Sequence, residues 1–130
     1  MTPEMWQRAE SSLVAGLLVV ATVHLDFAWW WLFALFLAFD LSAIGYLRGP
    51  SLGALMYNAV HSYMAPAVLF GAFVVTEVRW VGLLALAWAF HVAVDRALGY
   101  GLKHSDAFQH THLGWLPASR QQRSAAIPPE

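Results

Sequence analysis

Four long apolar runs, separated by short polar segments, dominate the chain. They predict helices over about residues 6–26, 28–47, 54–75 and 80–98. Each helix is close to the length of about 20 residues that an α-helix needs to cross the hydrocarbon core of a bilayer. Strands are not expected, because the runs are too long and do not alternate apolar with polar residues. The pattern therefore predicts an all-α integral membrane protein.

The segments between the runs predict how the helices follow one another. The sequence RGPSLG (Arg48–Gly53) predicts a turn after the second run, and Thr76–Arg79 predicts a short loop after the third. The glycines at 99 and 101 predict the end of the fourth helix, and Pro66 predicts a kink in the third. Because short loops join neighbouring helices that run in opposite directions, we expect an antiparallel four-helix bundle.

Composition supports lipid as the solvent and excludes several classes of function. Hydrophobic residues make up 59% of the chain and charged residues 12%, against roughly a quarter charged in ordinary soluble proteins. The net charge of -1 gives no basic footprint for nucleic acid. The absence of cysteine excludes disulfides, thiolate metal sites and cysteine nucleophiles. The N-terminal segment lacks a basic region, so the first run is expected to be a retained helix and not a signal peptide.

The basic residues predict how the bundle is oriented. Six lie at the termini or between the second and third helices, and only Arg79 lies on the opposite side. Because cytoplasmic loops carry the excess of Lys and Arg, both termini are predicted to be cytoplasmic. We expect one domain over residues 1–116, which ends in a segment on the cytoplasmic surface, and a disordered tail over 117–130. The six residues are Arg8, Arg48, Arg96, Lys103, Arg120 and Arg123.

This topology predicts that polar residues from three helices return to one depth. At about 1.5 Å per residue, Asp40 lies about 13 Å above the cytoplasmic end of its helix. Asn58 and His61 enter the next helix by about 8–12 Å, and His91 and Asp95 lie about 6–12 Å above the end of the last. We therefore predict one polar layer in the cytoplasmic half of the bilayer. Ionisable groups there are costly and usually functional.

The donor types in this layer indicate a metal site. Histidine nitrogen and carboxylate oxygen suit Zn, Fe or Mn, and helix bundles often build such sites from inward-facing His and carboxylate side chains. No Glu-x-x-His or His-Glu-x-x-His motif is present. Structural alternatives remain open: a helix-end ion pair for Asp95, interhelical hydrogen bonds for Asn58, and a favourable first-turn acid for Glu10. The predicted ligands are His61, His91, Asp95 and Asp40, with Glu10 and His112 as further candidates.

Four segments carry a resemblance to a known family. They are DLSAIGYLRG (Asp40–Gly49), GALMYNAVHSY (Gly53–Tyr63), HVAVDRALGYGLK (His91–Lys103) and THLG (Thr111–Gly114). In these motifs the chain resembles a family of small bacterial membrane proteins known as the domain of unknown function 4260. The resemblance implies four membrane helices in a bacterial cytoplasmic membrane. It implies no reaction.

The leading functional prediction is a small integral-membrane enzyme that acts on a lipid or another hydrophobic small molecule. In its metal-dependent form, the ion would activate water or oxygen. In a metal-free form, paired aspartates would serve as acid and base for epoxide opening, isomerisation or terpenoid cyclisation. The predicted catalytic residues are Asp40, Asp95, His91 and Asn58. The predicted substrate-binding residues are Tyr46, Arg96, Tyr100 and Lys103.

A non-enzymatic function remains the alternative. The polar layer could serve an ion-binding transporter or an accessory membrane subunit. Four helices are few for alternating access unless the protein oligomerises, for example as a homo-oligomer. The outer halves of the second, third and fourth helices carry no ionisable residue, which argues against a path through the bundle.

Overall fold

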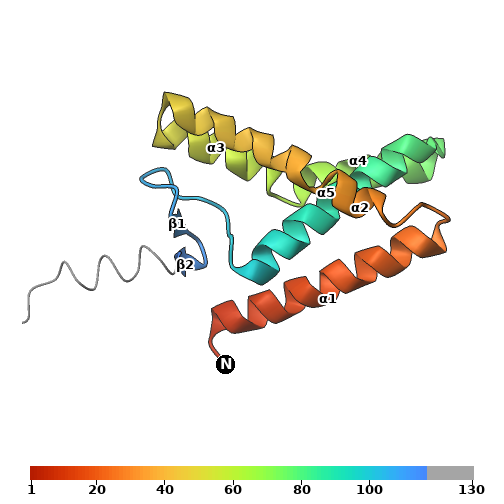
Figure 1. Ribbon diagram of the computed structural model, residues 1–130, viewed down its shortest axis with the longest axis horizontal. Helices are drawn as coiled ribbons and strands as arrows, with labels where there is room; N and C mark the ends of the chain where they lie inside the picture. Colours follow the sequence, from red (N-terminus) through yellow and green to blue (C-terminus); the bar gives the residue numbers. More distant parts are fainter. Residues whose placement is uncertain (117–130) are drawn as a thin grey trace, which may run out of the picture.

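The computed structural model describes residues 1–116 and is mostly helical (Figure 1). The predicted tail over 117–130 lies outside the described residues. The helices are α1 (Pro3–His24), α2 (Trp31–Ala34), the 3₁₀-helix η1 (Phe36–Arg48), α3 (Pro50–Val60), α4 (Met64–Thr76) and α5 (Arg79–Leu98). Two short strands follow, β1 (His110–Thr111) and β2 (Gly114–Trp115).

Helix α1 lies along α5, and hydrogen bonds tie the two helices together at both ends (Figure 1). Near the start of α1, Arg8 Nε donates to the carbonyl of Ala97 at 2.9 Å. At the other end, Arg79 Nη2 at the start of α5 donates to the carbonyl of Asp26 at 2.9 Å. The start of one helix therefore meets the end of the other.

The second apolar run forms two helices and not the single helix predicted over 28–47. The short α2 is followed by η1, whose backbone turns once in about three residues. Positions three apart therefore share a face: Leu41, Ile44 and Leu47 are exposed, while Ser42 and Gly45 are turned inward. This tighter winding gives η1 an apolar outer face and an inner face that packs against α3.

The third apolar run is also divided, into α3 and α4, with a break at residues 61–63. The kink predicted at Pro66 is found as a break a few residues before it. A proline ring clashes with the carbonyl four residues earlier, here that of Ser62, so the regular helix is interrupted before Pro66. Pro66 itself is fully buried in the first turn of α4. As a result, His61 lies at the C-terminal end of α3.

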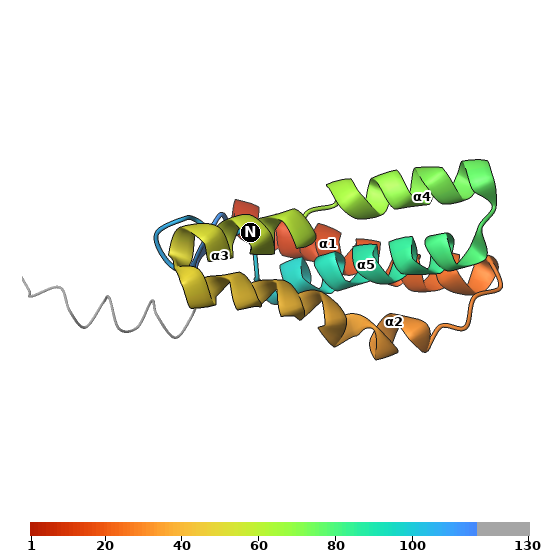
Figure 2. The ribbon, with the colours of Figure 1, turned by 90° about the horizontal axis from the view of Figure 1, so that it is seen from above.

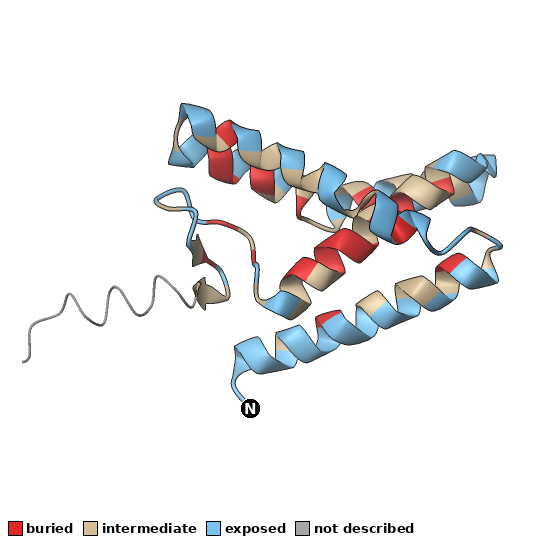
Figure 3. Ribbon diagram, in the orientation of Figure 1, coloured by how far each residue is buried: buried red, intermediate tan, exposed pale blue. Residues whose placement is uncertain are grey.

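Helix α5 matches the fourth predicted helix and is the most buried element. Seen from above, it lies between α4 and α2 (Figure 2), and buried residues follow its length (Figure 3). Leu86, Ala87 and Phe90 pack with Leu32 of α2 in the core. The helix ends at Gly99, whose φ of 97° is the left-handed conformation that glycine adopts readily. The predicted stop at Gly99 is therefore confirmed.

Three segments are long and apolar enough to cross a membrane, which supports a membrane protein. They are Trp31–Arg48, Pro50–Thr76 and Arg79–Leu98. Helix α1 has 22 residues but is not among them, because its first half carries Glu4, Gln7, Arg8 and Glu10. The first predicted membrane helix therefore remains a prediction.

Residues after α5 fold back over one end of the helices, where their backbone pairs with itself. Lys103 forms an isolated antiparallel bridge with Thr111, and β1 pairs with β2 in a small two-stranded sheet. Asn58 of α3 holds this segment through its side-chain amide, which donates to the carbonyl of Lys103 at 2.8 Å and accepts from its N–H at 2.6 Å. We call residues 100–116 the cap.

Candidate metal centre

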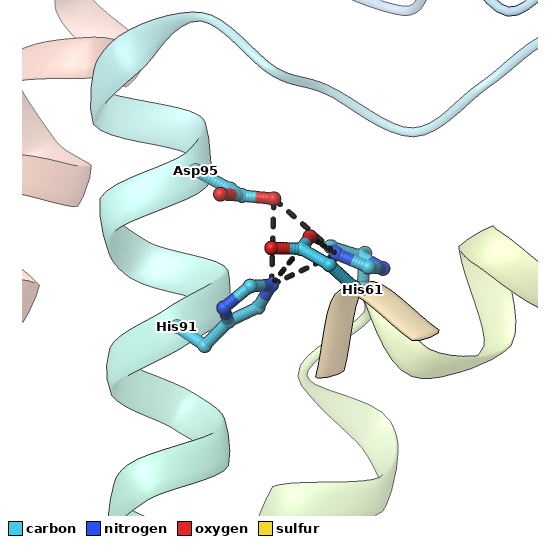
Figure 4. Close-up of side chains that lie close together, drawn as sticks. His61, His91 and Asp95 are labelled. Atoms are coloured by element: carbon cyan, nitrogen blue, oxygen red, sulfur yellow. Dashed lines mark hydrogen bonds and ion pairs between the residues drawn. The ribbon is translucent and has the colours of Figure 1, made fainter. Parts of the chain in front are cut away.

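Four side chains from three separate segments converge between η1, α3 and α5. Asp40 comes from η1, His61 from the end of α3, and His91 and Asp95 from α5. One nitrogen or oxygen of each lies within 4.8 Å of those of the other three. Figure 4 shows His61, His91 and Asp95 pointing toward a common centre. The predicted convergence of these four residues is therefore present in the structure.

The local structure explains why each side chain faces the centre. His91 and Asp95 are four residues apart on α5, so they lie one above the other on the same face. His61 is presented by the break that ends α3. Asp40 faces inward because η1 winds with three residues per turn, next to Phe39, whose ring lies 5.4 Å from the ring of His91.

Five of the six distances between the four atoms lie in a narrow range. His61 Nε2 lies 3.5 Å from Asp40 Oδ1 and 3.3 Å from Asp95 Oδ2. His91 Nε2 lies 3.5 Å and 3.6 Å from the same two atoms and 2.9 Å from His61 Nε2. A tetrahedron of ligands about 2.0–2.1 Å from a zinc ion has edges of about 3.3–3.4 Å. These five distances are close to such edges, and all four atoms lie within 4.8 Å of one another.

Tyr57 orients two of the four candidate ligands. Its backbone carbonyl lies 3.0 Å from His61 Nδ1, so this nitrogen carries the proton and Nε2 presents its lone pair to the centre. Its hydroxyl donates to Asp95 Oδ2 at 3.2 Å, and its ring stacks on His61 with 3.7 Å between centroids. A hydrogen bond to the second nitrogen is typical of histidines that bind metal.

The cluster concentrates atoms that can bind a cation. The carboxylate oxygens and the unprotonated nitrogen of His61 are acceptors, and His91 directs its Nε2 at His61 Nε2 from 2.9 Å. Buried acceptors are unfavourable unless a donor or a cation satisfies them. The donor set of two nitrogens and two oxygens suits Zn, Fe or Mn. These four residues could therefore hold a metal ion.

Three of the four side chains are buried or nearly buried, and the fourth, Asp40, is partly exposed. Both histidines are buried, the Asp95 side chain is 11% exposed, and the Asp40 side chain is 45% exposed. A groove of about 510 Å³ lies beside Asp40 and is lined by both of its neighbours, Phe39 and Leu41, and by Trp88. A hydrophobic molecule could therefore approach the centre from the apolar surface.

The other predicted site residues occupy different positions. Asn58 holds the backbone of Lys103 and is not in the cluster. Tyr46 packs against Phe108 with ring centroids 5.1 Å apart, and Tyr100 is exposed. The guanidinium of Arg96 lies 4.9 Å from the ring centroid of Tyr63. None of these contacts involves a residue of the cluster.

Glu10 and His112 are not brought together with the other predicted ligands. Glu10 is exposed on α1. His112 Nδ1 accepts from the N–H of Leu102 at 2.8 Å, so this nitrogen is used to hold the cap. Among residues 1–116, the group that could hold an ion contains neither.

Lys103 is the buried cation closest to the cluster. Its side-chain nitrogen has no hydrogen-bond partner among the described residues. It lies 4.0 Å from the ring centroid of Phe108, 4.9 Å from that of Tyr57 and 5.8 Å from that of Tyr100. Burial lowers the pKa of Lys103 to about 8, and the Asp95 carboxylate opposes part of this shift. The amine is therefore largely protonated at neutral pH.

Tyr57 is the functional residue that the sequence analysis missed. Its position four residues before His61 was the available signal, because that spacing on a helix places a donor ring over the imidazole. An aromatic residue in a membrane helix is too common for this spacing to stand out. Its contact with Asp95, 38 positions away, is visible only in the fold.

The comparisons with known proteins add a family but no activity. No curated protein and no solved structure matches this chain. A family profile described as "Domain of unknown function" matches residues 4–116, which is most of the chain. The chain therefore belongs to this family, DUF4260.

Proposed function

We propose that this protein is a small integral-membrane metalloenzyme that acts on a lipid or another hydrophobic small molecule. The observation that carries the proposal is the convergence of His61, His91, Asp40 and Asp95 from three segments, with ligand atoms within 4.8 Å of one another. Such groups are costly between apolar helices unless they bind a cation. Zn, Fe and Mn fit the donor set.

The open side of the centre supports a catalytic role for the ion. Structural zinc sites use four protein ligands, whereas catalytic sites leave a position for water or substrate. Asp40 is the most exposed of the four and lies on the separate helix η1. Its release or movement would provide that position. The ion would then lower the pKa of a bound water or polarise a substrate oxygen.

The apolar surroundings support a hydrophobic substrate. The groove beside Asp40 is lined by Leu41, which is 73% exposed on the outer face of η1. In a bilayer this opening would face acyl chains and not water. A substrate dissolved in the membrane could then enter laterally and reach the centre without crossing the cap.

We further propose a four-span antiparallel bundle in a bacterial cytoplasmic membrane, with both termini in the cytoplasm. Six basic residues on the predicted cytoplasmic side against Arg79 on the other support this orientation. The hydrogen bonds of Arg8 and Arg79 to opposite ends of the α1–α5 pair support an antiparallel arrangement. In this orientation the metal centre lies in the cytoplasmic half.

A metal-free acid–base enzyme is the second candidate. The two carboxylates of the cluster have unequal surroundings, since Asp95 is nearly buried and bonded to Tyr57 while Asp40 is half exposed. A pair of carboxyl groups in unequal environments is what an acid and a base require. This candidate would use the same residues without an ion.

Metal analysis of purified protein distinguishes the two candidates. Wild type is expected to contain close to one equivalent of Zn, Fe or Mn, and His91→Ala is expected to lose most of it. The matched control is His24→Ala, because His24 lies at the far end of α1, outside the cluster. Metal-free wild type, prepared without chelators, would reject the metalloenzyme and favour the acid–base enzyme.

A further inference from the structure

Lys103 has three unused hydrogen-bond donors beside the metal centre. The residue is 4% exposed, and its nitrogen has no acceptor among the described residues. Contacts with aromatic rings stabilise an ammonium by about 0.5–2 kcal/mol. They do not replace the hydrogen bonds to water that burial removes. A buried ammonium of this kind is suited to an acceptor that arrives with a ligand.

Tyr57 contacts both Lys103 and two residues of the metal centre. The ammonium lies 4.9 Å from the ring centroid of Tyr57, and this same ring stacks on His61 and donates to Asp95. A ligand that contacted both Lys103 and the metal would need to span little more than this one ring. Phe108, which is 38% exposed, is the aromatic ring nearest to the ammonium, at 4.0 Å.

The formal charges indicate the sign of the ligand. A divalent ion, the carboxylates of Asp40 and Asp95 and two neutral imidazoles sum to zero. The ammonium of Lys103 then leaves one uncompensated positive charge in a region of low dielectric. A monoanion bound near the metal and Lys103 would neutralise this positive charge. It would also accept charge-assisted hydrogen bonds from the ammonium.

We propose that Lys103 binds the oxyanion head group of the substrate, and that the substrate is an anionic amphiphile. This inference rests on the proposed metal-dependent function. The head group, a carboxylate or a phosphate, would replace Phe108 at the ammonium. The apolar chain would extend into the groove of about 640 Å³ that Lys103 itself lines with Pro50, Leu52 and Leu55. Arg96 is not part of this subsite, because its guanidinium lies over Tyr63.

Calorimetric titration of metal-loaded, full-length protein in nonionic detergent tests the proposal. The probes are decanoate, acetate and inorganic phosphate. Decanoate is expected to bind more tightly than acetate or phosphate, because its chain fills the groove. Lys103→Met is expected to weaken binding of decanoate at least tenfold, the loss expected for one charged hydrogen bond. Equal affinities of decanoate and acetate would overturn the proposal that the ligand is amphiphilic. They would indicate that the subsite binds a free anion.

The matched control is Arg79→Gln, which removes a positive charge from the start of α5, far from Lys103 along the helix. It is expected to leave decanoate affinity unchanged. An equal loss in both variants would show diffuse surface attraction and overturn the subsite, as would no loss in Lys103→Met. Wild type provides a measurement that needs no substitution: its affinity is expected to fall as Lys103 loses its proton above about pH 8.

Metal content, measured on every sample, separates this inference from the proposed function. Wild type without metal rejects the metalloenzyme. If wild type and Lys103→Met both contain metal and bind decanoate equally well, only the Lys103 subsite is rejected.

Discussion

Tyr57 is the residue that contacts both the candidate site and the cap. It orients His61 through its backbone carbonyl, bonds Asp95 through its hydroxyl, and places its ring between His61 and the ammonium of Lys103. Partners of metal ligands commonly change metal affinity by 10–100-fold when they are removed. At the scale of the residue, Tyr57 therefore determines how the centre is held and what lies above it.

Lys103 predicts how stability depends on pH. Its pKa is about 8 in the folded protein against a model value of 10.5, so the unfolded chain binds more protons between these values. The free energy of unfolding should therefore rise with pH from about 8 to 10.5. Chemical unfolding in detergent at a series of pH values measures this dependence.

Lys103→Met supplies the comparison for this prediction. The titratable groups that face Lys103 are Asp95 of α5, Tyr57 of α3 and Tyr100 of the cap. They are common to both proteins and largely cancel in the difference. The variant should be more stable than wild type at pH 7, and the difference should shrink above pH 8. A difference that is independent of pH would contradict the lowered pKa.

At the scale of the element, η1 and α3 position Asp40 and His61 by close contact. A Cβ on Gly53 of α3 would overlap the ring of Tyr46, and a Cβ on Gly45 of η1 would lie 2.7 Å from Met56 Sδ. The two helices approach this closely because both positions lack a side chain. The distance from Asp40 to His61 therefore depends on two glycines that contact neither.

Gly53→Ala should separate η1 from α3. The added methyl group displaces Tyr46, and overpacking of this kind usually lowers the free energy of unfolding by about 1–3 kcal/mol. Asp40 should move with η1, so metal affinity should fall as well. Thermal unfolding and metal titration on the same preparation measure both effects.

Gly71→Ala is the control within a neighbouring helix. No atom lies within 4 Å of the added methyl group, and alanine favours a helix over glycine by about 1 kcal/mol. This variant should be as stable as wild type or more stable, with unchanged metal affinity. Equal losses in Gly53→Ala and Gly71→Ala would contradict the argument from close packing.

At the scale of the whole molecule, the cap and its buried ammonium lie toward one end. The cap lies at the end of the bundle where α5 finishes, while the turn from α4 to α5 at Glu77 lies at the other (Figure 1). If that end faces the cytoplasm, anionic head groups of the inner leaflet lie beside Lys103. The orientation of the protein therefore determines which lipid head groups lie close to Lys103.

Single cysteines can test the orientation, because the chain has none of its own. Thr76→Cys, at the turn before α5, should react with a membrane-impermeant thiol reagent in intact cells. Ser105→Cys, in the exposed part of the cap, should react only after the membrane is permeabilised. The cysteine-free wild type controls for background labelling, and the reverse pattern would contradict cytoplasmic termini.

Much of the candidate site could be predicted before the fold was known. The spacing of His91 and Asp95 placed them on one face of a helix, and alternation of helix direction returned Asp40 and His61 to the same depth. Both arguments use only the rise per residue and the length of each run. Depth alone could not separate the four cluster residues from Asn58, which lies in the same layer but binds the cap.

The sequence by itself determined that this protein is helical, that it has segments apolar enough to cross a membrane, and that Asp40, His61, His91 and Asp95 converge. These properties follow from composition and from periodicity along a single segment. Only the tertiary structure decided that Tyr57 bonds Asp95 and that Lys103 lies buried without a hydrogen-bond partner among the described residues. Such features depend on contacts between residues 30 or more positions apart, and local patterns carry no information about the distance between two segments that pack together.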